Sequence, residues 1–197
     1  MSTSVDFFNR QFSANVREGE HDLNPFELMS LPFLTGDVLD FGCGLGNLAI
    51  AAVENGCRVV ALDASSTAIA HLQGEAARRS LPLTAFQADL RSYHFDASYD
   101  GVVSIGLLMF FAQPTATAHL DLLMSSVRPG GIAAINVLIE GTSFLDMFDE
   151  DSYYLFRRDE LKLAFEGWEI LVESYEDFNA PRGTVKCFAT VIARRPN

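Results

Sequence analysis

The sequence predicts an α/β fold with a mostly parallel sheet, a C-terminal antiparallel hairpin and helices on both faces of the sheet. Short apolar runs alternate with helix-period patterns between residues 38 and 139, which is typical of parallel strands joined by crossover helices. A turn with three glycines follows the first apolar run directly. Two β-rich runs joined by a loop at residues 181–183 end the chain, and this spacing indicates a hairpin. Five alternating units and one hairpin give a seven-stranded mixed sheet.

The first 35 residues predict two helices that precede the sheet. Apolar side chains recur every three or four positions over residues 4–16, which gives an amphipathic helix with one aromatic face. Asn24-Pro25 is typical of a helix start, so a short second helix is expected through Leu31. These helices either cover a pocket or pack against the sheet edge. We expect a single domain, with residues 1–35 as a helical cap and residues 36–197 as the core.

Strands and helices of the core are expected to alternate in a fixed order. Strands are predicted up to Asp40 and then at residues 57–62, 82–87, 101–105, 132–139, 168–173 and 186–193. Helices are predicted at residues 45–52, 66–79, 114–127 and 158–165, the third of them ending at a breaker cluster of residues 128–131. In the third strand, Leu83, Ala85 and Phe86 are expected to point inward. Residues 140–157 have no period but many aromatic side chains, and we expect them to cover a pocket.

The composition is that of a globular protein that does not bind nucleic acid. With 26 acidic and 14 basic residues the formal net charge is −12, and phosphate binding needs clustered lysine and arginine. An anionic membrane is disfavoured for the same reason, and the longest apolar stretch is shorter than the roughly 20 residues that cross a bilayer. The three cysteines have no paired spacing, so neither a disulfide framework nor a metal site is indicated. We expect a soluble cytoplasmic protein, either a monomer or a homodimer.

Residues that follow the strands make up the predicted ligand site. In an open α/β sheet, ligands bind beyond the carboxyl ends of the strands, where N–H groups of a following helix face the ligand. Asp63 follows the second strand, about 20 positions after the first glycine of the turn, where an acid can accept hydrogen bonds from ribose hydroxyls. The candidate cofactor-binding residues are Asp40, Gly42, Cys43, Gly44, Gly46, Asn47, Asp63, Ala64, Asp89, Leu90, Ser104, Ile105 and Gly106.

The glycine turn distinguishes between two cofactors. A dinucleotide needs G-x-G-x-x-G spacing, whereas the glycines at 42, 44 and 46 run G-x-G-x-G and Asn47 follows them. Asp40 would also place a negative charge close to any phosphate. S-adenosylmethionine has no phosphate, and an acid at the end of the first strand attracts its ammonium and sulfonium groups. The turn therefore favours S-adenosylmethionine over a dinucleotide.

Several motifs together resemble the class I S-adenosylmethionine-dependent methyltransferases, whose fold is a Rossmann-like seven-stranded sheet. The motifs are Val38-Leu39-Asp40-Phe41-Gly42-Cys43-Gly44-Leu45-Gly46, Ala61-Leu62-Asp63, Ala88-Asp89-Leu90, Tyr99-Asp100 and Arg128-Pro129-Gly130-Gly131, and they cover most of the chain. The resemblance implies that Asp63 binds the ribose of the cofactor and that Asp89 pairs with its adenine amino group. It also implies an enzyme that transfers the methyl group in line to an acceptor.

A narrower resemblance is to the tellurite-resistance methyltransferases and their small-molecule relatives. It rests on Ser104 with Leu108-Met109-Phe110-Phe111, on Phe156 with Glu160-Leu161 and Phe165-Glu166-Gly167-Trp168-Glu169, and on Phe188-Ala189-Thr190 with Ile192-Ala193-Arg194. Where that family tends to carry a histidine and an arginine near its substrate, this chain has Tyr175 and Glu176. The resemblance implies a small-molecule acceptor. Thiol, selenium and tellurium species are the acceptors that need no general base.

Acceptor contacts are expected after the fourth strand, in the aromatic segment and at two arginines. The substrate candidates are Met109, Phe110, Tyr153, Tyr154, Arg182 and Arg17. No catalytic residue is assigned, because the histidines have no evident partners and Cys43 would be hidden by the cofactor. Two other functions remain open. A non-catalytic module would bind S-adenosylmethionine without transferring its methyl group, and a nicotinamide-dependent oxidoreductase would be stabilised by NAD instead.

Overall fold

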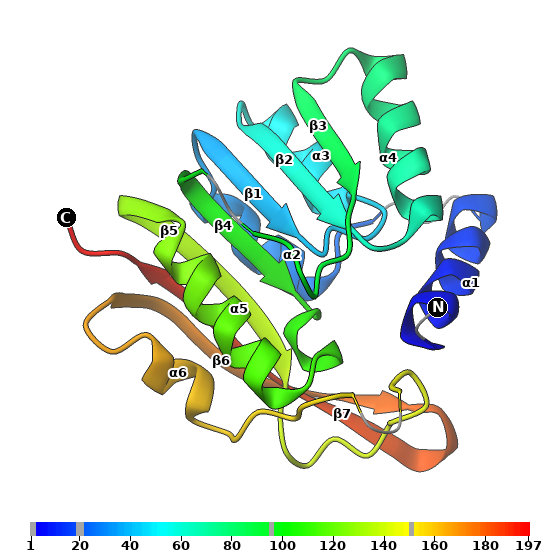
Figure 1. Ribbon diagram of the computed structural model, residues 1–197, viewed down its shortest axis with the longest axis vertical. Coiled ribbons are helices and arrows are strands. Elements are labelled where there is room, and N and C mark those ends of the chain that lie inside the picture. Colours follow the sequence, from blue (N-terminus) through cyan, green and yellow to red (C-terminus); the bar gives the residue numbers. More distant parts are fainter. Residues whose placement is uncertain (1–2, 19–21, 95–96, 150–151) are drawn as a thin grey trace.

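The computed structural model describes residues 3–18, 22–94, 97–149 and 152–197 of the chain. It contains a seven-stranded sheet in the order β3-β2-β1-β4-β5-β7-β6 (Figure 1). Strands β1 to β5 run parallel to one another, and β7 lies antiparallel between β5 and β6. The predicted seven-stranded mixed sheet with a C-terminal antiparallel hairpin is therefore confirmed.

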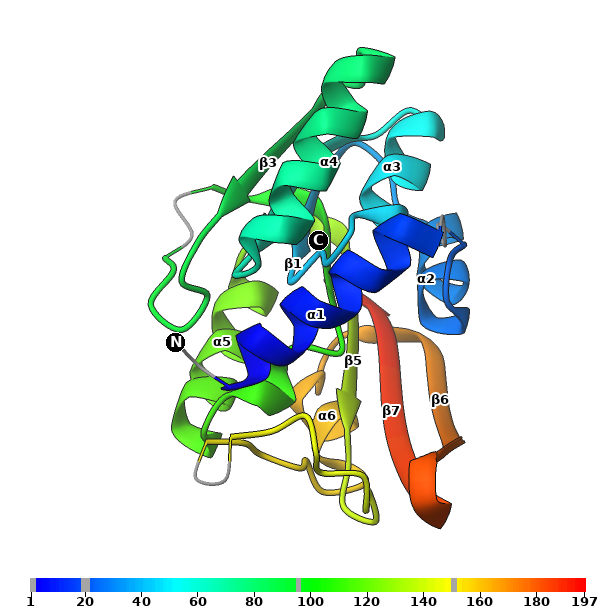
Figure 2. The same cartoon turned by 90° about the vertical axis from the view of Figure 1, so that its right-hand side faces the viewer.

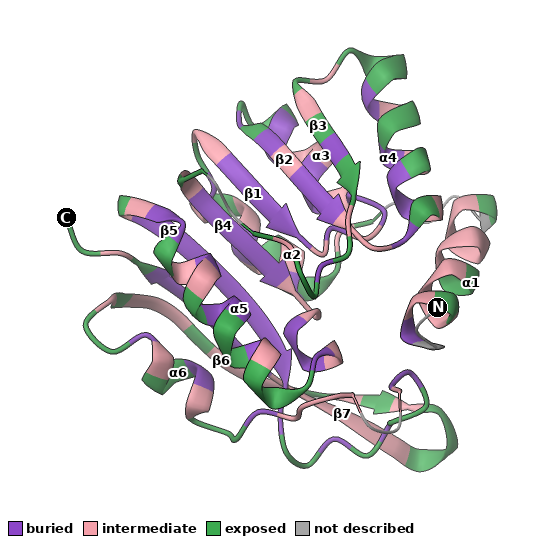
Figure 3. Cartoon of the chain, viewed as in Figure 1, coloured by how far each residue is buried: buried purple, intermediate pink, exposed green. Residues whose placement is uncertain are grey.

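The strands coincide with the predicted apolar runs, and those of the hairpin are longer than expected. They are β1 (Asp37–Phe41), β2 (Arg58–Asp63), β3 (Leu83–Gln87), β4 (Tyr99–Ile105), β5 (Val127–Leu138), β6 (Glu169–Ala180) and β7 (Thr184–Arg194). Helices cover both faces of the central strands, so β1, β4 and β5 are buried along most of their length (Figure 3). This burial explains their almost continuous apolar sequences.

Helices cover the sheet in two layers, and one more helix lies at the edge where the parallel strands end. One layer holds α2 (Pro25–Ser30), α3 (Asn47–Glu54) and α4 (Ser66–Arg79), and the other holds α5 (Gln113–Ser125) and α6 (Glu160–Ala164). The helix α1 (Thr3–Glu18) belongs to neither layer and crosses the carboxyl ends of the strands (Figure 2). Short 3-10 turns occupy Leu31–Phe33, Leu108–Phe110 and Pro181–Gly183.

None of the helices within the described ranges is long and apolar enough to cross a bilayer.

Strand β3 corrects one expectation about side-chain direction. Ala85 is buried, but the side chain of Phe86 is 49% exposed rather than turned inward. Successive side chains on a strand point to opposite faces, so the two neighbours cannot both face the core. Ala85 packs in one cluster with Ile69 and Leu72 of α4, so Phe86 points to the opposite face of this edge strand.

The breaker cluster at residues 128–131 also lies elsewhere than expected. It follows α5 as predicted, but it forms part of β5 instead of preceding that strand. Tyr99 pairs with Val127 and Gly101 pairs with Ile132, so residues 128–131 bulge out opposite a single residue of β4. Glycine and proline favour such a bulge because they weaken regular strand pairing.

An ion-pair network at the opposite end of the sheet from α1 requires Gly36. The Arg128 guanidinium contacts Asp100 at 2.8 Å and Asp37 at 2.9 Å, and the backbone N–H of Asp37 donates to Asp100 at 2.8 Å. Gly36 has a φ of +67°, and a Cβ on it would lie 2.2 Å from Asp100 Oδ2. A side chain at this position would therefore displace the Asp100 carboxylate from its partners.

We expect Gly36→Ala to lower the free energy of unfolding by about 3 kcal/mol, through backbone strain and the displaced carboxylate. The matched control is Gly56→Ala, because Gly56 also has a positive φ, +93°, but a Cβ there meets nothing within 4 Å. That variant should lose only about 1 kcal/mol. Urea unfolding of both variants measures the difference, and equal losses would show that crowding at Asp100 does not matter.

Candidate active site

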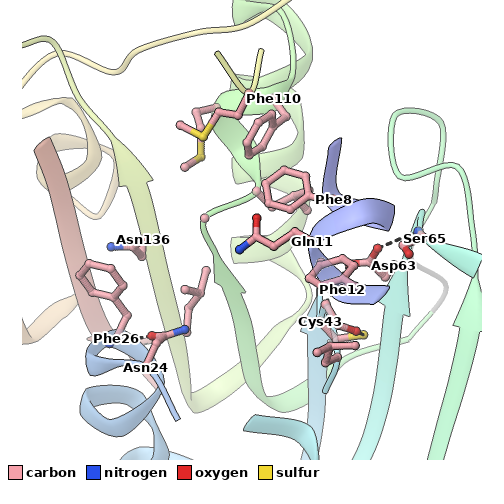
Figure 4. Close-up of a pocket in the computed structure, with 18 of the residues that line it drawn as sticks. Phe8, Gln11, Phe12, Asn24, Phe26, Cys43, Asp63, Ser65, Phe110 and Asn136 are labelled. Carbon is pink, nitrogen blue, oxygen red and sulfur yellow. Dashed lines mark hydrogen bonds between the residues drawn. The ribbon is translucent and has the colours of Figure 1, made fainter. Parts of the chain in front are cut away.

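A cavity of about 700 Å³ lies beyond the carboxyl ends of the strands and beneath α1. Its size is that of a small-molecule site. Figure 4 shows two halves with α1 between them. On one side lie Asp63, Ser65 and Cys43, on the other lie Asn24, Phe26 and Asn136, and the α1 residues between them are Phe8 and Gln11. The first half is the predicted cofactor side.

The glycine turn after β1 is fixed by β2 and by α4. The backbone N–H groups of Gly42 and Cys43 both donate to the Leu62 carbonyl, at 2.8 and 3.0 Å. Gly46 has a φ of +78°, and a Cβ on it would lie 2.5 Å from the side chain of Leu72. Glycine is required there because the backbone is left-handed and the helix packs against it. The turn therefore presents bare backbone to the cavity.

Asp63, at the end of β2, binds the glycine turn and also lines the cavity. Its Oδ2 accepts the N–H of Gly44 at 2.9 Å, and its Oδ1 accepts the N–H of Ser65 at 2.8 Å. Burial raises the pKa of Asp63, and these backbone hydrogen bonds oppose that shift. Each carboxylate oxygen can accept a second hydrogen bond. The group can therefore hold the turn and still accept from a ligand hydroxyl.

Asp40 lies at the end of β1 in an acidic part of the wall. Its side chain is 5% exposed, and burial, together with the nearby Glu27 and Asp63, raises its pKa to about 8. Within the described ranges no hydrogen-bond donor contacts its carboxyl group. Glu27 comes from α2, where its carboxylate accepts the backbone N–H of Asn24 at 2.7 Å in a capping box. Three carboxyl groups therefore converge on one part of the cavity.

These three carboxyl groups fit S-adenosylmethionine and do not fit a pyrophosphate. A phosphate would add negative charge beside Asp40, Glu27 and Asp63 in a partly desolvated site, which further disfavours the ionised forms of these groups and costs free energy. A ligand cation would instead favour the ionised form of Asp40 and compensate for its burial. Asp40 and Glu27 are therefore the groups that can hold the cationic part of the cofactor, and Asp63 can hold a hydroxyl-bearing part.

Helix α1 closes the cavity through three contacts. Phe12 lies on the glycine turn, so that a Cβ on Gly44 would be 3.3 Å from its ring. The hydroxyl of Ser65 donates to the side-chain oxygen of Asn9. Phe8 packs edge-on against Phe110, with ring centroids 5.2 Å apart. Of the two expected positions for the N-terminal helix, the structure shows the one that covers the pocket.

The structure brings most of the predicted cofactor residues to the cavity wall. Asp40, Gly42, Cys43, Gly44, Gly46, Asn47, Asp63, Ala64, Asp89, Leu90, Ile105 and Gly106 line it. Ser104 does not, because it is fully buried inside β4, and its hydroxyl has no hydrogen-bond partner in the described part of the chain. Burial raises the pKa of the Cys43 thiol well above its usual value, which disfavours a nucleophilic thiolate.

The substrate candidates separate into two groups. Met109 and Phe110 line the cavity. Tyr153 stacks on Phe148 instead, and Tyr154 hydrogen-bonds to Glu160 and Gln113. Arg182 pairs with Asp146 in the hairpin turn, and the exposed Arg17 donates to the carbonyl of Ser13 within α1. The last four side chains are absent from the wall of this cavity. From residues 140–157, Met147 reaches the wall, while residues 150–151 lie outside the described part of the chain.

Sequence reasoning missed several residues that line the cavity. Glu27 and Phe26 follow the recognised helix start at Asn24-Pro25, but nothing in that pattern places α2 beside the glycine turn. Asn136 and Lys186 lie within strands and belong to no motif. Two features of the sequence could have pointed to them. Asn136 is an amide inside an otherwise apolar strand, and Lys186 is one of only two lysines in the chain.

Comparisons with known proteins agree with the geometry of the first half. Residues 38–131 match the methyltransferase domain family. The chain is 29% identical over 143 residues to hemagglutinin 1 of Eikenella corrodens, covering 71% of this chain and 45% of that protein. It is 25% identical over 198 residues to the probable S-adenosyl-L-methionine-dependent methyltransferase TehB of Haemophilus influenzae, covering 96% of this chain and 66% of that protein. The chain thus spans less than two thirds of the length of these curated relatives.

Two solved structures have the same fold. The crystal structure of TehB from Haemophilus influenzae superposes with a TM-score of 0.77 at 19% identity, covering 92% of this chain and 65% of that chain. The N-methyltransferase NodS from Bradyrhizobium japonicum WM9, in complex with S-adenosyl-L-homocysteine, superposes with a TM-score of 0.76 at 16% identity, covering 99% and 100% of the two chains. Likeness at this identity shows that the Rossmann-like methyltransferase fold is shared.

Proposed function

We propose that this chain is a class I S-adenosylmethionine-dependent methyltransferase that methylates a small molecule inside the cavity described above. The proposal is supported by the match to the methyltransferase domain family and by the resemblance to TehB in sequence and fold. The observation that carries the proposal is one cavity, covered by α1, with two unlike halves. One half has a glycine turn and acidic side chains, and the other is apolar and aromatic. A cationic methyl donor and a small acceptor need these two environments side by side.

The first half would hold the cofactor through the ends of three strands. Asp63 would accept hydrogen bonds from the ribose hydroxyls, Asp89 would accept from the adenine amino group, and Asp40 with Glu27 would face the charged amino-acid part. When bound, S-adenosylmethionine supplies a methyl group on a sulfonium sulfur, which leaves as neutral S-adenosylhomocysteine when the acceptor lone pair takes the methyl carbon. The glycine turn would let the cofactor approach the backbone closely.

The second half would position the acceptor and exclude water. Phe8 and Phe110 close the cavity from α1 and from the segment after β4, and Met109 and Met147 add apolar surface. Holding a nucleophile in line with the methyl group in a dry site supplies much of the acceleration that such a transfer needs. No side chain has to act as a base when the acceptor is a thiol, selenium or tellurium species that is already ionised.

The cavity also bears on the two other functions that the sequence left open. The converging Asp40, Glu27 and Asp63 argue against an oxidoreductase that binds a pyrophosphate. A non-catalytic module that binds S-adenosylmethionine would have the same cavity, so only a turnover measurement distinguishes it from a methyltransferase. The volume of about 700 Å³ and the cover provided by α1 favour a small molecule over a macromolecule as the acceptor.

Two measurements test the proposal. S-adenosylmethionine at roughly a hundred times its Kd should raise the melting temperature by about 5 °C or more, whereas NAD should not. A panel of thiols, selenite, tellurite, phenols and amines should then include an acceptor that releases S-adenosylhomocysteine. Stabilisation by the cofactor with no turnover of any acceptor would favour a binding module, and stabilisation by NAD alone would favour an oxidoreductase.

A further inference from the structure

The acceptor half of the cavity has an aromatic wall that comes from the hairpin and α2. Phe178 of β6 and Phe188 of β7 lie side by side, with ring centroids 5.8 Å apart. Phe26 of α2 packs against both, at 5.6 and 4.8 Å. All three line the cavity, so they form one aromatic surface rather than scattered core positions. A surface of this kind binds a flat ring well.

Asn136 lines this half of the cavity and carries a buried acceptor without a partner in the described part of the chain. Its side chain is fully buried, and its amide nitrogen donates to the hydroxyl of Thr190 at 2.9 Å, which fixes the orientation of the group. Its Oδ1 has no hydrogen-bond partner in the described part of the chain, although the residue lines the cavity. The backbone carbonyl oxygen of Asn136 accepts the N–H of Gly106 at 3.0 Å, so the residue lies next to the predicted cofactor loop. A buried acceptor without a donor costs free energy, which a bound N–H or O–H group would recover.

Lys186 brings a positive charge to the same wall. The chain has two lysines, and the other, Lys162, pairs with Glu173 on the surface at 2.8 Å. Lys186 has no carboxylate partner within the described ranges, and its ammonium lies over the ring of Phe144, 4.8 Å from the ring centroid. Burial lowers the pKa of this lysine. An anionic group in the cavity would compensate for that cost.

The two polar groups lie on either side of the aromatic surface. Lys186 and Thr190 are four residues apart on β7, about 13 Å of strand, and Thr190 pairs with Asn136 of β5. Phe188 lies between them on the same face of β7, because alternate residues share a face. A molecule held at both ends would therefore lie across the aromatic surface, with one end beside the cofactor loop.

We infer that the acceptor is an aromatic acid, with its ring on Phe26, Phe178 and Phe188, an N–H, O–H or S–H group at Asn136 Oδ1 and a carboxylate at Lys186. This inference rests on the proposed methyl transfer and narrows its acceptor. The group at Asn136 is the nucleophile: its lone pair forms the bond to the methyl carbon, the carbon–sulfur bond of the cofactor breaks with its electrons on sulfur, and the displaced proton leaves to water. Selenite and tellurite, which have no ring, should be poor acceptors.

The test compares acids with uncharged analogues of the same shape. The panel consists of mercapto-, hydroxy- and aminobenzoic acids and the corresponding benzamides, scored by release of S-adenosylhomocysteine. The wild-type protein should use at least one acid with a KM about ten-fold or more below that of its amide. Equal or better use of the amides would overturn the inference. If no member turns over, calorimetry with protein loaded with S-adenosylhomocysteine decides, since failure of every acid to bind overturns it too.

Two variants test the roles of the side chains. Lys186→Met should raise KM for the acids about ten-fold or more and leave the amides unchanged, Lys186→Arg should restore much of the loss, and Lys162→Met should change nothing. A fall in kcat for acids and amides alike, with an altered pH profile, would make Lys186 a base and overturn its assignment. Asn136→Leu should weaken acceptor binding, whereas Thr190→Val, which removes only the supporting hydroxyl, should weaken it less. The rise in melting temperature with S-adenosylmethionine is measured separately for the wild-type protein and for each variant. If the cofactor does not stabilise the wild-type protein, the proposed function itself has failed.

Discussion

Replacing Asp63 by alanine is expected to weaken S-adenosylmethionine binding by about a hundred-fold or more. Hydrogen bonds from a ligand to a charged group contribute about 1.5–3 kcal/mol each, and a ribose offers two hydroxyls to this carboxylate. The loss should be larger than that for other wall residues, because Asp63 also accepts the N–H groups of Gly44 and Ser65 and so shapes the turn beneath the cofactor. Isothermal titration calorimetry measures the affinity.

Two controls separate the loss of a ligand contact from loss of the fold. Asp121→Ala removes an exposed carboxylate of α5 and should bind the cofactor as the wild-type protein does. Asp63→Asn keeps the size of the side chain and should bind more weakly than the wild-type protein but better than the alanine variant. Circular dichroism melts without cofactor show whether each variant is folded. An Asp63→Ala protein that is folded and binds with unchanged affinity would refute the ribose assignment.

Replacing Asp40 by asparagine is expected to stabilise the cofactor-free protein at high pH and to weaken cofactor binding. The pKa of Asp40 is about 8 in the folded protein, whereas an aspartate in the unfolded chain has its usual pKa of about 4. The folded state therefore holds a proton that the unfolded state has released between these values. The contribution of this carboxyl group to the free energy of unfolding is fully present below about pH 4. It falls by about 1.4 kcal/mol per pH unit as the pH rises towards 8.

The Asn variant has no proton to lose, so the two proteins should diverge as the pH rises. Urea unfolding of the cofactor-free proteins at pH 6, 7 and 8 should show a wild-type stability that falls relative to Asp40→Asn across the series. Saturating S-adenosylmethionine should remove most of that difference, because the cation favours the ionised carboxyl group. Parallel pH curves for the two proteins would show that Asp40 is not a buried acid with a raised pKa.

The sequence was sufficient to predict the sheet and most of the cavity wall around the glycine turn, because both follow from local pattern. Apolar runs of strand length locate the parallel strands, and the carboxyl ends of such strands meet at one edge. Asp40, Asp63 and Asp89 each lie at the end of a predicted strand or within two residues of it, so their convergence required no knowledge of packing. The glycine spacing added the choice of cofactor.

The other half of the cavity could not be predicted because it depends on tertiary packing. Phe178 and Phe188 look like ordinary strand residues until the order of the hairpin strands is known, since β7 lies between β5 and β6. Phe26 reaches the same wall only because α2 packs near the hairpin, and no local pattern encodes that contact. Phe86 was wrongly predicted to point inward, because the apolar character of a side chain does not show which face of an edge strand is covered.

The most direct test of the account is a reaction with S-adenosylmethionine that carries an isotopically labelled methyl group. The protein, the labelled cofactor and the aromatic acid panel are incubated together and analysed by mass spectrometry. We predict an acceptor that gains the labelled methyl group and an equal amount of S-adenosylhomocysteine, with both products lost in Asp63→Ala. No labelled acceptor and no S-adenosylhomocysteine, from wild-type protein whose binding of the cofactor has been verified, would contradict the assignment of this chain as a methyltransferase that acts on such acceptors.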